Sequence, residues 1–101
     1  MGKAKARVGR RKVVVQTIGY RGKRERRTDL GDLKQARSFI VYKDDAKGLK
    51  VGKTVTVTIA GKKVKAKVKR WSRGSRLLLP VTPYPLRKVS PKKLRRALVK
   101  G

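Results

Sequence analysis

The sequence contains no cysteine, no histidine and no asparagine, and it has only five acidic residues. The lack of cysteine excludes disulfide bonds and thiolate metal sites. The lack of histidine removes the side chain most often used for general acid–base catalysis. Five carboxylates are too few to predict a two-metal centre. We therefore expect the protein not to be an enzyme, and to hold no metal and no other cofactor.

Long apolar runs are also missing. No stretch approaches the ~20 apolar residues that a membrane-spanning helix requires. The basic start "MGKAKARVGRRK" leads only into "VVV", far short of the apolar core of a secretory signal peptide. These features predict a cytoplasmic protein without a membrane partner. The scarcity of thermolabile residues beside abundant charge is typical of a thermophile.

What the sequence has in excess is positive charge. It contains 32 Lys and Arg residues, its formal net charge is +27, and its isoelectric point is near 11.8. Solubility of a small domain requires a net charge of only about 2–8, and self-repulsion at higher charge opposes compaction. An excess of this size predicts a polyanionic partner, and nucleic acid is the first candidate.

The charge is spread along the chain rather than gathered in one segment. All five acids lie between Glu25 and Asp45. Residues 46–101 contain 18 Lys and Arg and no acid, and residues 1–24 contain 9 and no acid. A protein that binds a groove usually needs one basic face. A chain that is basic at both ends indicates a protein surrounded by phosphate.

The stretch "TVTVTIAGKKVKAKVKR" (54–70) alternates apolar and polar residues on both sides of a glycine. Strict alternation is the pattern of a strand with one buried face, and a Gly61-Lys62 turn would join two such strands. The apolar pairs would then be Ile59–Val64, Val57–Ala66 and Val55–Val68, and the polar pairs Thr58–Lys65, Thr56–Lys67 and Thr54–Lys69. A slip of one residue would put lysines into the core, so the pattern predicts this hairpin.

Three further segments are typical of strands because they are rich in β-branched and other apolar residues. These are residues 13–20, 38–43 and 76–81, the last limited at its end by Pro80. A short helical turn is expected near 32–36. Such short strands with small loops predict a mainly β domain, either an SH3-like barrel or an OB-fold. The short loops and a terminal helix favour the SH3-like barrel.

The chain ends are expected to lie outside this barrel, which we assign to residues 13–81. Residues 1–12 have almost no apolar content and predict a basic N-terminal extension. Residues 82–101 predict an extended connector and a short basic helix. In that helix Ser90 would be the N-cap, Pro91 the first helical residue, and Gly101 would follow the end. The helix is too short to be stable alone, so its Leu94, Ala97 and Leu98 must dock on the barrel or on a partner.

Basic residues at strand spacing are the main candidates for binding. Lys65, Lys67 and Lys69 would lie two residues apart on one strand face, at a spacing close to that of the phosphates along a nucleic-acid strand. Trp71 could fill the core or stack on a splayed base. The full set of predicted RNA-binding residues is Arg10, Arg11, Lys12, Arg21, Lys23, Arg24, Lys65, Lys67, Lys69, Arg70, Trp71, Arg73, Arg76, Lys92, Lys93, Arg95 and Arg96.

Small size, high isoelectric point and basic ends resemble those of a ribosomal protein. Within that class, "VGKTV…GKKVKAKVKRWSRGSRLLLP" (51–80) and "GYRGKRERR" (19–27) are similar to segments of the archaeal–eukaryotic large-subunit family numbered thirty-five-A. The family carries a histidine–glycine pair in the turn where this chain has "WSRG". The resemblance implies an SH3-like barrel held against ribosomal RNA.

From these observations we expect a structural protein of an archaeal-type ribosome, more readily of the large subunit, that contacts ribosomal RNA phosphates and neighbouring ribosomal proteins. No small-molecule substrate is expected. Two alternatives stay open. One is a DNA-compacting chromatin protein of a thermophile, since such proteins also use small barrels with basic sheets and an apolar wedge. The other is a ribosome-associated or RNA-modification accessory factor.

Overall fold

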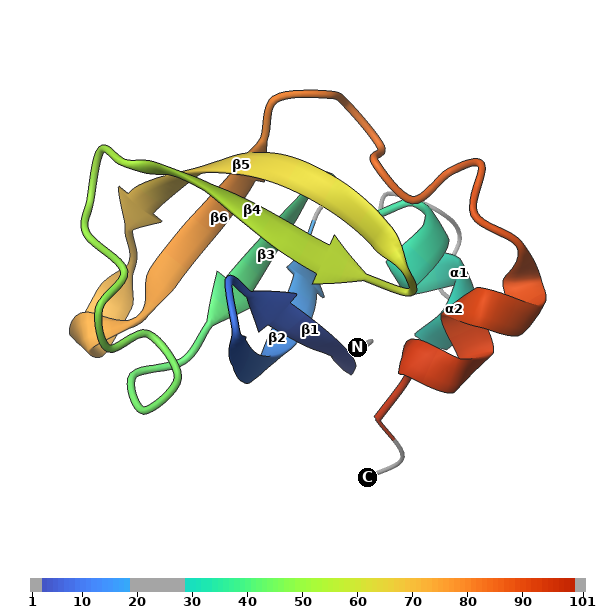
Figure 1. The fold of residues 1–101 in the computed structure, drawn as a ribbon, viewed down its shortest axis with the longest axis horizontal. Helices are drawn as coiled ribbons and strands as arrows, with labels where there is room; N and C mark the ends of the chain where they lie inside the picture. The colour runs from blue at the N-terminus through green and yellow to red at the C-terminus, as the bar shows by residue number, and fades with distance from the viewer. Residues whose placement is uncertain (1–2, 19–28, 100–101) are drawn as a thin grey trace.

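The computed structural model describes residues 3–18 and 29–99, and these form a closed barrel of six antiparallel strands with short helices at one end (Figure 1). The strands are β1 (Lys3–Val8), β2 (Arg11–Ile18), β3 (Ser38–Val41), β4 (Thr54–Ile59), β5 (Lys62–Arg70) and β6 (Arg76–Pro80), and the helices are α1 (Asp29–Lys34) and α2 (Pro91–Ala97). The order around the barrel is β1-β2-β3-β6-β5-β4, and β4 pairs with β1 to close it. The mainly β prediction is confirmed, and the architecture is consistent with a small SH3-like barrel.

The first strand corrects the prediction that residues 1–12 extend away from the barrel. Residues 3–8 form β1, which pairs with β2 on one side and β4 on the other. Ala4 and Ala6 are buried, while the cationic residues between them are exposed. The alternation is that of a half-buried strand, with alanine as the apolar partner. Alanine is uncommon in strands, so the composition of residues 1–12 predicted an extension. Their two-residue period indicated the strand that the structure shows.

The hairpin of β4 and β5 is confirmed, but its predicted register is wrong by two residues. Val57 pairs with Val64, and Thr56 pairs with Lys65. The turn residues are Ala60 (φ +52°) and Gly61 (φ +80°), and positive φ at both central positions is what a type I′ turn requires. Because the shift equals the two-residue period of a strand, the lysines still face outward.

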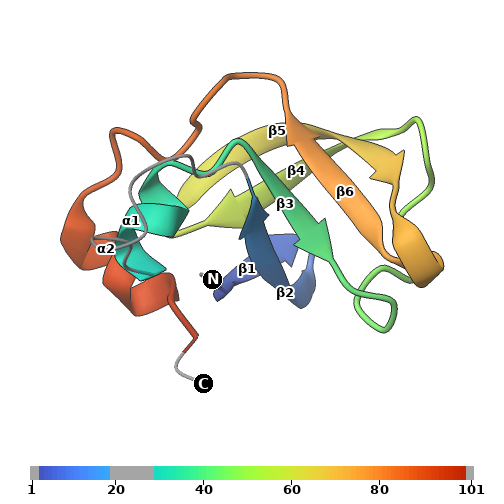
Figure 2. The same ribbon diagram turned by 180° about the vertical axis from the view of Figure 1, so that it is seen from behind.

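The core fills the barrel and is closed at one end by the helices. Phe39, Ile59 and Leu78 are its largest fully buried strand residues. Leu33 of α1 and Leu94 of α2 are also fully buried, and Figures 1 and 2 show both helices at the same end of the barrel. Of the two docking places predicted for the C-terminal helix, the barrel and a partner, the structure shows the barrel.

Local contacts fix α2 at this position. The Ser90 hydroxyl accepts a hydrogen bond from the Lys93 amide at 3.4 Å, which confirms the predicted N-cap. Beyond the helix, Leu98 forms a bridge to Ala4. The Val99 amide then donates to the Lys3 carbonyl at 2.9 Å. The C-terminal segment thus holds the edge of β1, while the predicted end at Gly101 lies outside the described residues.

Replacement of Ala60 by glycine tests the turn. We expect Ala60→Gly to raise the free energy of unfolding by about 1 kcal/mol, since a left-handed alanine costs roughly 1–2 kcal/mol and the lost side chain offsets part of the gain. The same change in mid-strand, Ala66→Gly, should lower it. The measurement is urea denaturation. If Gly61-Lys62 were the turn, Ala60 would lie in a strand and its substitution would destabilise by roughly 0.5–1 kcal/mol.

Candidate nucleic-acid interface

One outer face of the barrel carries a regular array of lysines and threonines, which we call the lysine face. On β5 the residues alternate, so that Val64, Ala66 and Val68 are buried while the lysines are exposed. Neighbouring β4 places a threonine directly opposite three of these lysines. The lysine face consists of Lys63, Lys65, Lys67 and Lys69 of β5 and Thr54, Thr56 and Thr58 of β4.

The lysine face suits a phosphate backbone. Successive lysines on one strand face lie roughly 6.4–6.8 Å apart, because each residue rises 3.2–3.4 Å. The ammonium groups supply charge and the threonine hydroxyls can donate further hydrogen bonds. Contacts of both kinds are the common ones to nucleic-acid phosphates. Lys63, which sequence analysis did not select, lies on the same strand face two residues before Lys65, and in the observed register it pairs with Thr58.

The basic surface continues across the closure of the barrel. Arg7 of β1 is paired with Thr58 of β4 on one side and with Lys12 of β2 on the other. Since Thr58 also faces Lys63, a row runs across four strands, about 14 Å from end to end at a strand spacing of 4.7–4.9 Å. The prediction of a basic extension over residues 1–12 leaves Arg7 out of the site, although the alternation of these residues is present in the sequence.

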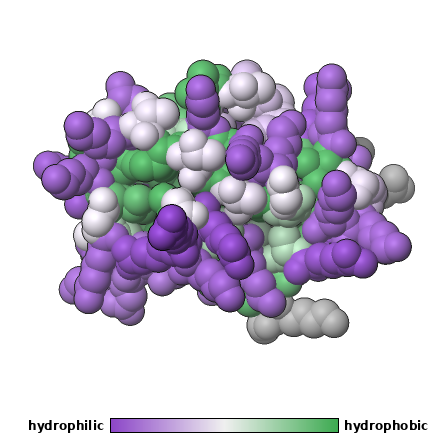
Figure 3. Space-filling view, in the orientation of Figure 1, coloured by the Kyte–Doolittle hydropathy of each residue, from purple (hydrophilic) through white to green (hydrophobic). Residues whose placement is uncertain are grey.

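An apolar flank borders the lysine face on the side of β6. Leu79 pairs with Lys67 and is 39% exposed. Val81 follows the strand, is 69% exposed, and donates its amide to the Lys65 carbonyl at 3.0 Å. Figure 3 shows such apolar patches among projecting hydrophilic side chains. Side chains of this kind can contact sugars or bases that flank a bound phosphate.

β5 ends at the end of the barrel opposite the helices (Figure 1), and Trp71 follows it directly, before the short 3-10 turn Ser72–Gly74. Trp71 is 40% exposed, so of its two predicted roles core filling is wrong. Arg70 and Arg73 on either side are also exposed. An exposed indole with arginines near it in the sequence is available for stacking on an unpaired base.

Arg76 and Arg11 were predicted to bind phosphate, but their side chains hold loops of the barrel. Arg76 is partly buried; its Nε donates to the Leu49 carbonyl at 3.2 Å and its Nη1 to the Ser75 carbonyl at 3.0 Å. Arg11 donates from Nη2 to the Asp44 carbonyl at 2.9 Å and from Nη1 to the Lys47 carbonyl. Both arginines therefore anchor the loop that precedes β4.

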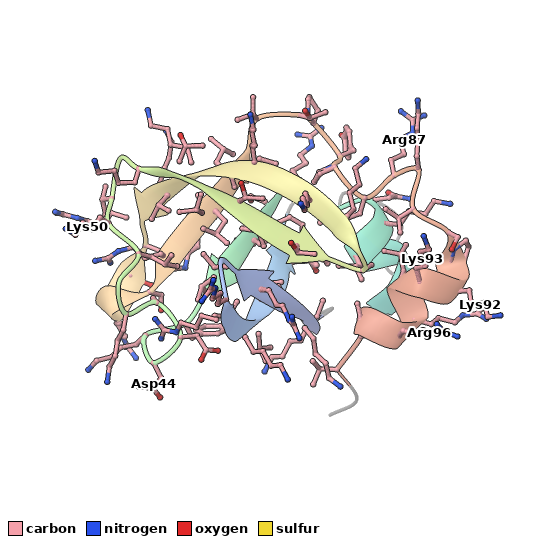
Figure 4. All side chains as sticks on the ribbon, viewed as in Figure 1. Asp44, Lys50, Arg87, Lys92, Lys93 and Arg96 are labelled. Carbon is pink, nitrogen blue, oxygen red and sulfur yellow. The ribbon has the colours of Figure 1, made fainter. Side chains whose placement is uncertain are left out.

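The other predicted residues are distributed over the molecule. Arg10 is exposed in the β1–β2 turn, and all four basic residues of α2 are exposed. Figure 4 shows Lys92, Lys93 and Arg96 at the end of the barrel opposite Lys50. Positive side chains therefore lie at both ends. The remaining predicted residues, Arg21, Lys23 and Arg24, lie outside the described residues.

Comparison of the chain with protein-family models, with curated proteins and with solved structures found no match. The resemblance to a ribosomal family therefore stays a prediction. Within residues 3–18 and 29–99, no group of three or more metal-ligating side chains lies together. In the same part of the chain, no helix is both long and apolar enough to cross a membrane.

Arg70 and Arg76 provide a matched test of anchoring, because they face each other across β5 and β6. Arg76→Ala should lower the free energy of unfolding by ~1–3 kcal/mol, since its carbonyl partners lose their donors. Arg70→Ala should change it by no more than ~0.5 kcal/mol. Chemical denaturation of both variants is the measurement. Equal effects would show that Arg76 does not anchor the loop.

Proposed function

We propose that the protein is a structural RNA-binding component of the ribosome, in the large subunit, and that it acts by neutralising ribosomal RNA phosphates. The observation that carries the proposal is the arrangement of its +27 net charge. Exposed cations form the lysine face, continue onto β1, and occupy both ends of the barrel. A protein with cations on so many sides is suited to enclosure by a folded polyanion.

The proposed mechanism is binding by shape and charge. The barrel fixes the backbone of β5, so its exposed lysines start from regularly spaced positions and each can reach one phosphate. Phosphate contacts position a protein on nucleic acid without reading its sequence. Double-stranded RNA is recognised mainly through its shape and backbone. No catalytic step and no cofactor enter this function, and neighbouring ribosomal proteins would contact the surface that RNA leaves free.

A second candidate, DNA compaction, is favoured by the apolar flank. Leu79 and Val81 are exposed beside lysines, and minor-groove proteins insert apolar side chains between base steps while cations contact phosphates. Against this candidate, a duplex bound to one sheet face would leave the basic residues of α2 and of the Trp71 turn without a partner. We therefore favour RNA.

Sedimentation distinguishes the two candidates. Ribosomal subunits from cells that produce the protein are separated on gradients containing high salt, and the fractions are probed for the chain. The proposal predicts co-sedimentation with the large subunit. Release from the subunits together with equal affinity for any DNA duplex would contradict it and support the DNA-compacting candidate. Release with a preference for RNA would instead indicate an accessory factor.

Charge removal on the lysine face tests the phosphate contacts. We expect the double variant Lys65→Gln/Lys67→Gln to bind double-stranded RNA more weakly and to lower the slope of log affinity against log salt by about 2, since each lost phosphate contact contributes roughly 1. Titrations at several salt concentrations measure this slope. The charge-retaining variant Lys65→Arg/Lys67→Arg should keep it. Identical slopes for the wild type and the glutamine variant would contradict the proposed contacts.

A further inference from the structure

A groove with a basic rim lies beside α2, at the border of the lysine face, with which it shares Thr58. It has a volume of about 710 Å³ and is bounded by β1, β2, the β4–β5 turn and α2. Five cationic side chains line it: Lys5, Arg7, Lys12, Lys93 and Arg96. Apolar residues supply much of the rest of its wall: Ala6, Val13, Val14, Ala60 and Ala97.

The charge of this groove is strongly unbalanced. Its single carboxylate is Asp45, whose Oδ2 already accepts a hydrogen bond from the Val14 amide at 3.1 Å. The five cations are drawn together from three elements, which costs energy through their mutual repulsion. A ligand that brings negative charge to the rim would relieve that repulsion. The wall between the cations is apolar, so the same ligand should carry a flat, weakly polar part.

We propose that this groove binds a single unpaired nucleotide of the RNA, with its base against the apolar wall and its two flanking phosphates on the cationic rim. This proposal rests on the proposed function. It adds which feature of the RNA, an unpaired nucleotide, the groove would bind. A volume of about 710 Å³ falls within the roughly 300–1,000 Å³ of small-ligand pockets. Proteins that recognise RNA commonly do so at bulges and loops, where bases can be splayed out of the stack.

The basic residues of α2 divide into two pairs with respect to the groove. Lys93 and Arg96 are three residues apart, the spacing of neighbours on one helix face, and both line the groove. Lys92 and Arg95 are also exposed but do not line it. Figure 4 shows Lys93 and Arg96 on the helix next to the barrel. Alanine substitution of either pair removes the same charge from the same helix, so each pair controls for the other.

The test uses two RNA hairpins that differ by one bulged 2-aminopurine nucleotide in an otherwise paired stem. The wild-type protein should bind the bulged hairpin roughly tenfold more tightly, equivalent to about 1.4 kcal/mol, and 2-aminopurine fluorescence should change as the base enters the groove. Lys93→Ala/Arg96→Ala should lose this preference and the fluorescence change. Lys92→Ala/Arg95→Ala should keep both. Lys5→Gln on β1 gives a second test that does not alter the helix.

The outcomes separate the groove from the proposed function. Equal binding of both hairpins by the wild type would overturn the groove proposal, while RNA binding that still depends on Lys65 and Lys67 would leave the proposed function standing. An equal loss of preference in both α2 variants would also overturn it, because the effect would then reflect net charge alone. Failure of the wild type to bind either hairpin would contradict the proposed function as well.

Discussion

Mutual repulsion among 32 cationic side chains is the constraint on which the rest of the structure depends. Burying an unpaired charge is costly, and none of the charged side chains described by the structure is classed as buried. Strict two-residue alternation meets this requirement, because every β5 residue between two exposed lysines is apolar and points into the core. The barrel closes around apolar side chains, most of them aliphatic, while its cations stay in water.

The same alternation relates the fold to the proposed function. It arranges lysines at regular intervals along β5, and the antiparallel pairing with β4 sets threonines beside them. Closure through β1 brings Arg7 to the edge of this array, and docking of α2 brings Lys93 and Arg96 to the groove beside it. A small domain has a slim stability margin, so a bound polyanion that offsets the repulsion would stabilise the folded state by linkage.

The sequence predicted strands β2 to β6, the two short helices and the outward direction of the lysines, because these follow from local patterns. It did not predict the register of the hairpin. A turn at Ala60-Gly61 and a turn at Gly61-Lys62 place the same side chains on the outer face, so the alternation cannot distinguish them. β1 was missed because alanine replaces the usual β-branched residues. The carbonyl contacts of Arg11 and Arg76, and the meeting of α2 with β1 and β2 at the groove, join residues distant in sequence, so no local pattern indicates them.

The central claim is that ribosomal RNA phosphates neutralise the positive charge on the surface of the barrel. Crosslinking in intact cells, followed by purification of the protein and sequencing of the attached nucleic acid, tests it most directly. The account predicts that ribosomal RNA dominates the attached material, at a few discrete sites in the large-subunit RNA. Recovery of chromosomal DNA in its place, or of the protein with no nucleic acid attached, would contradict it.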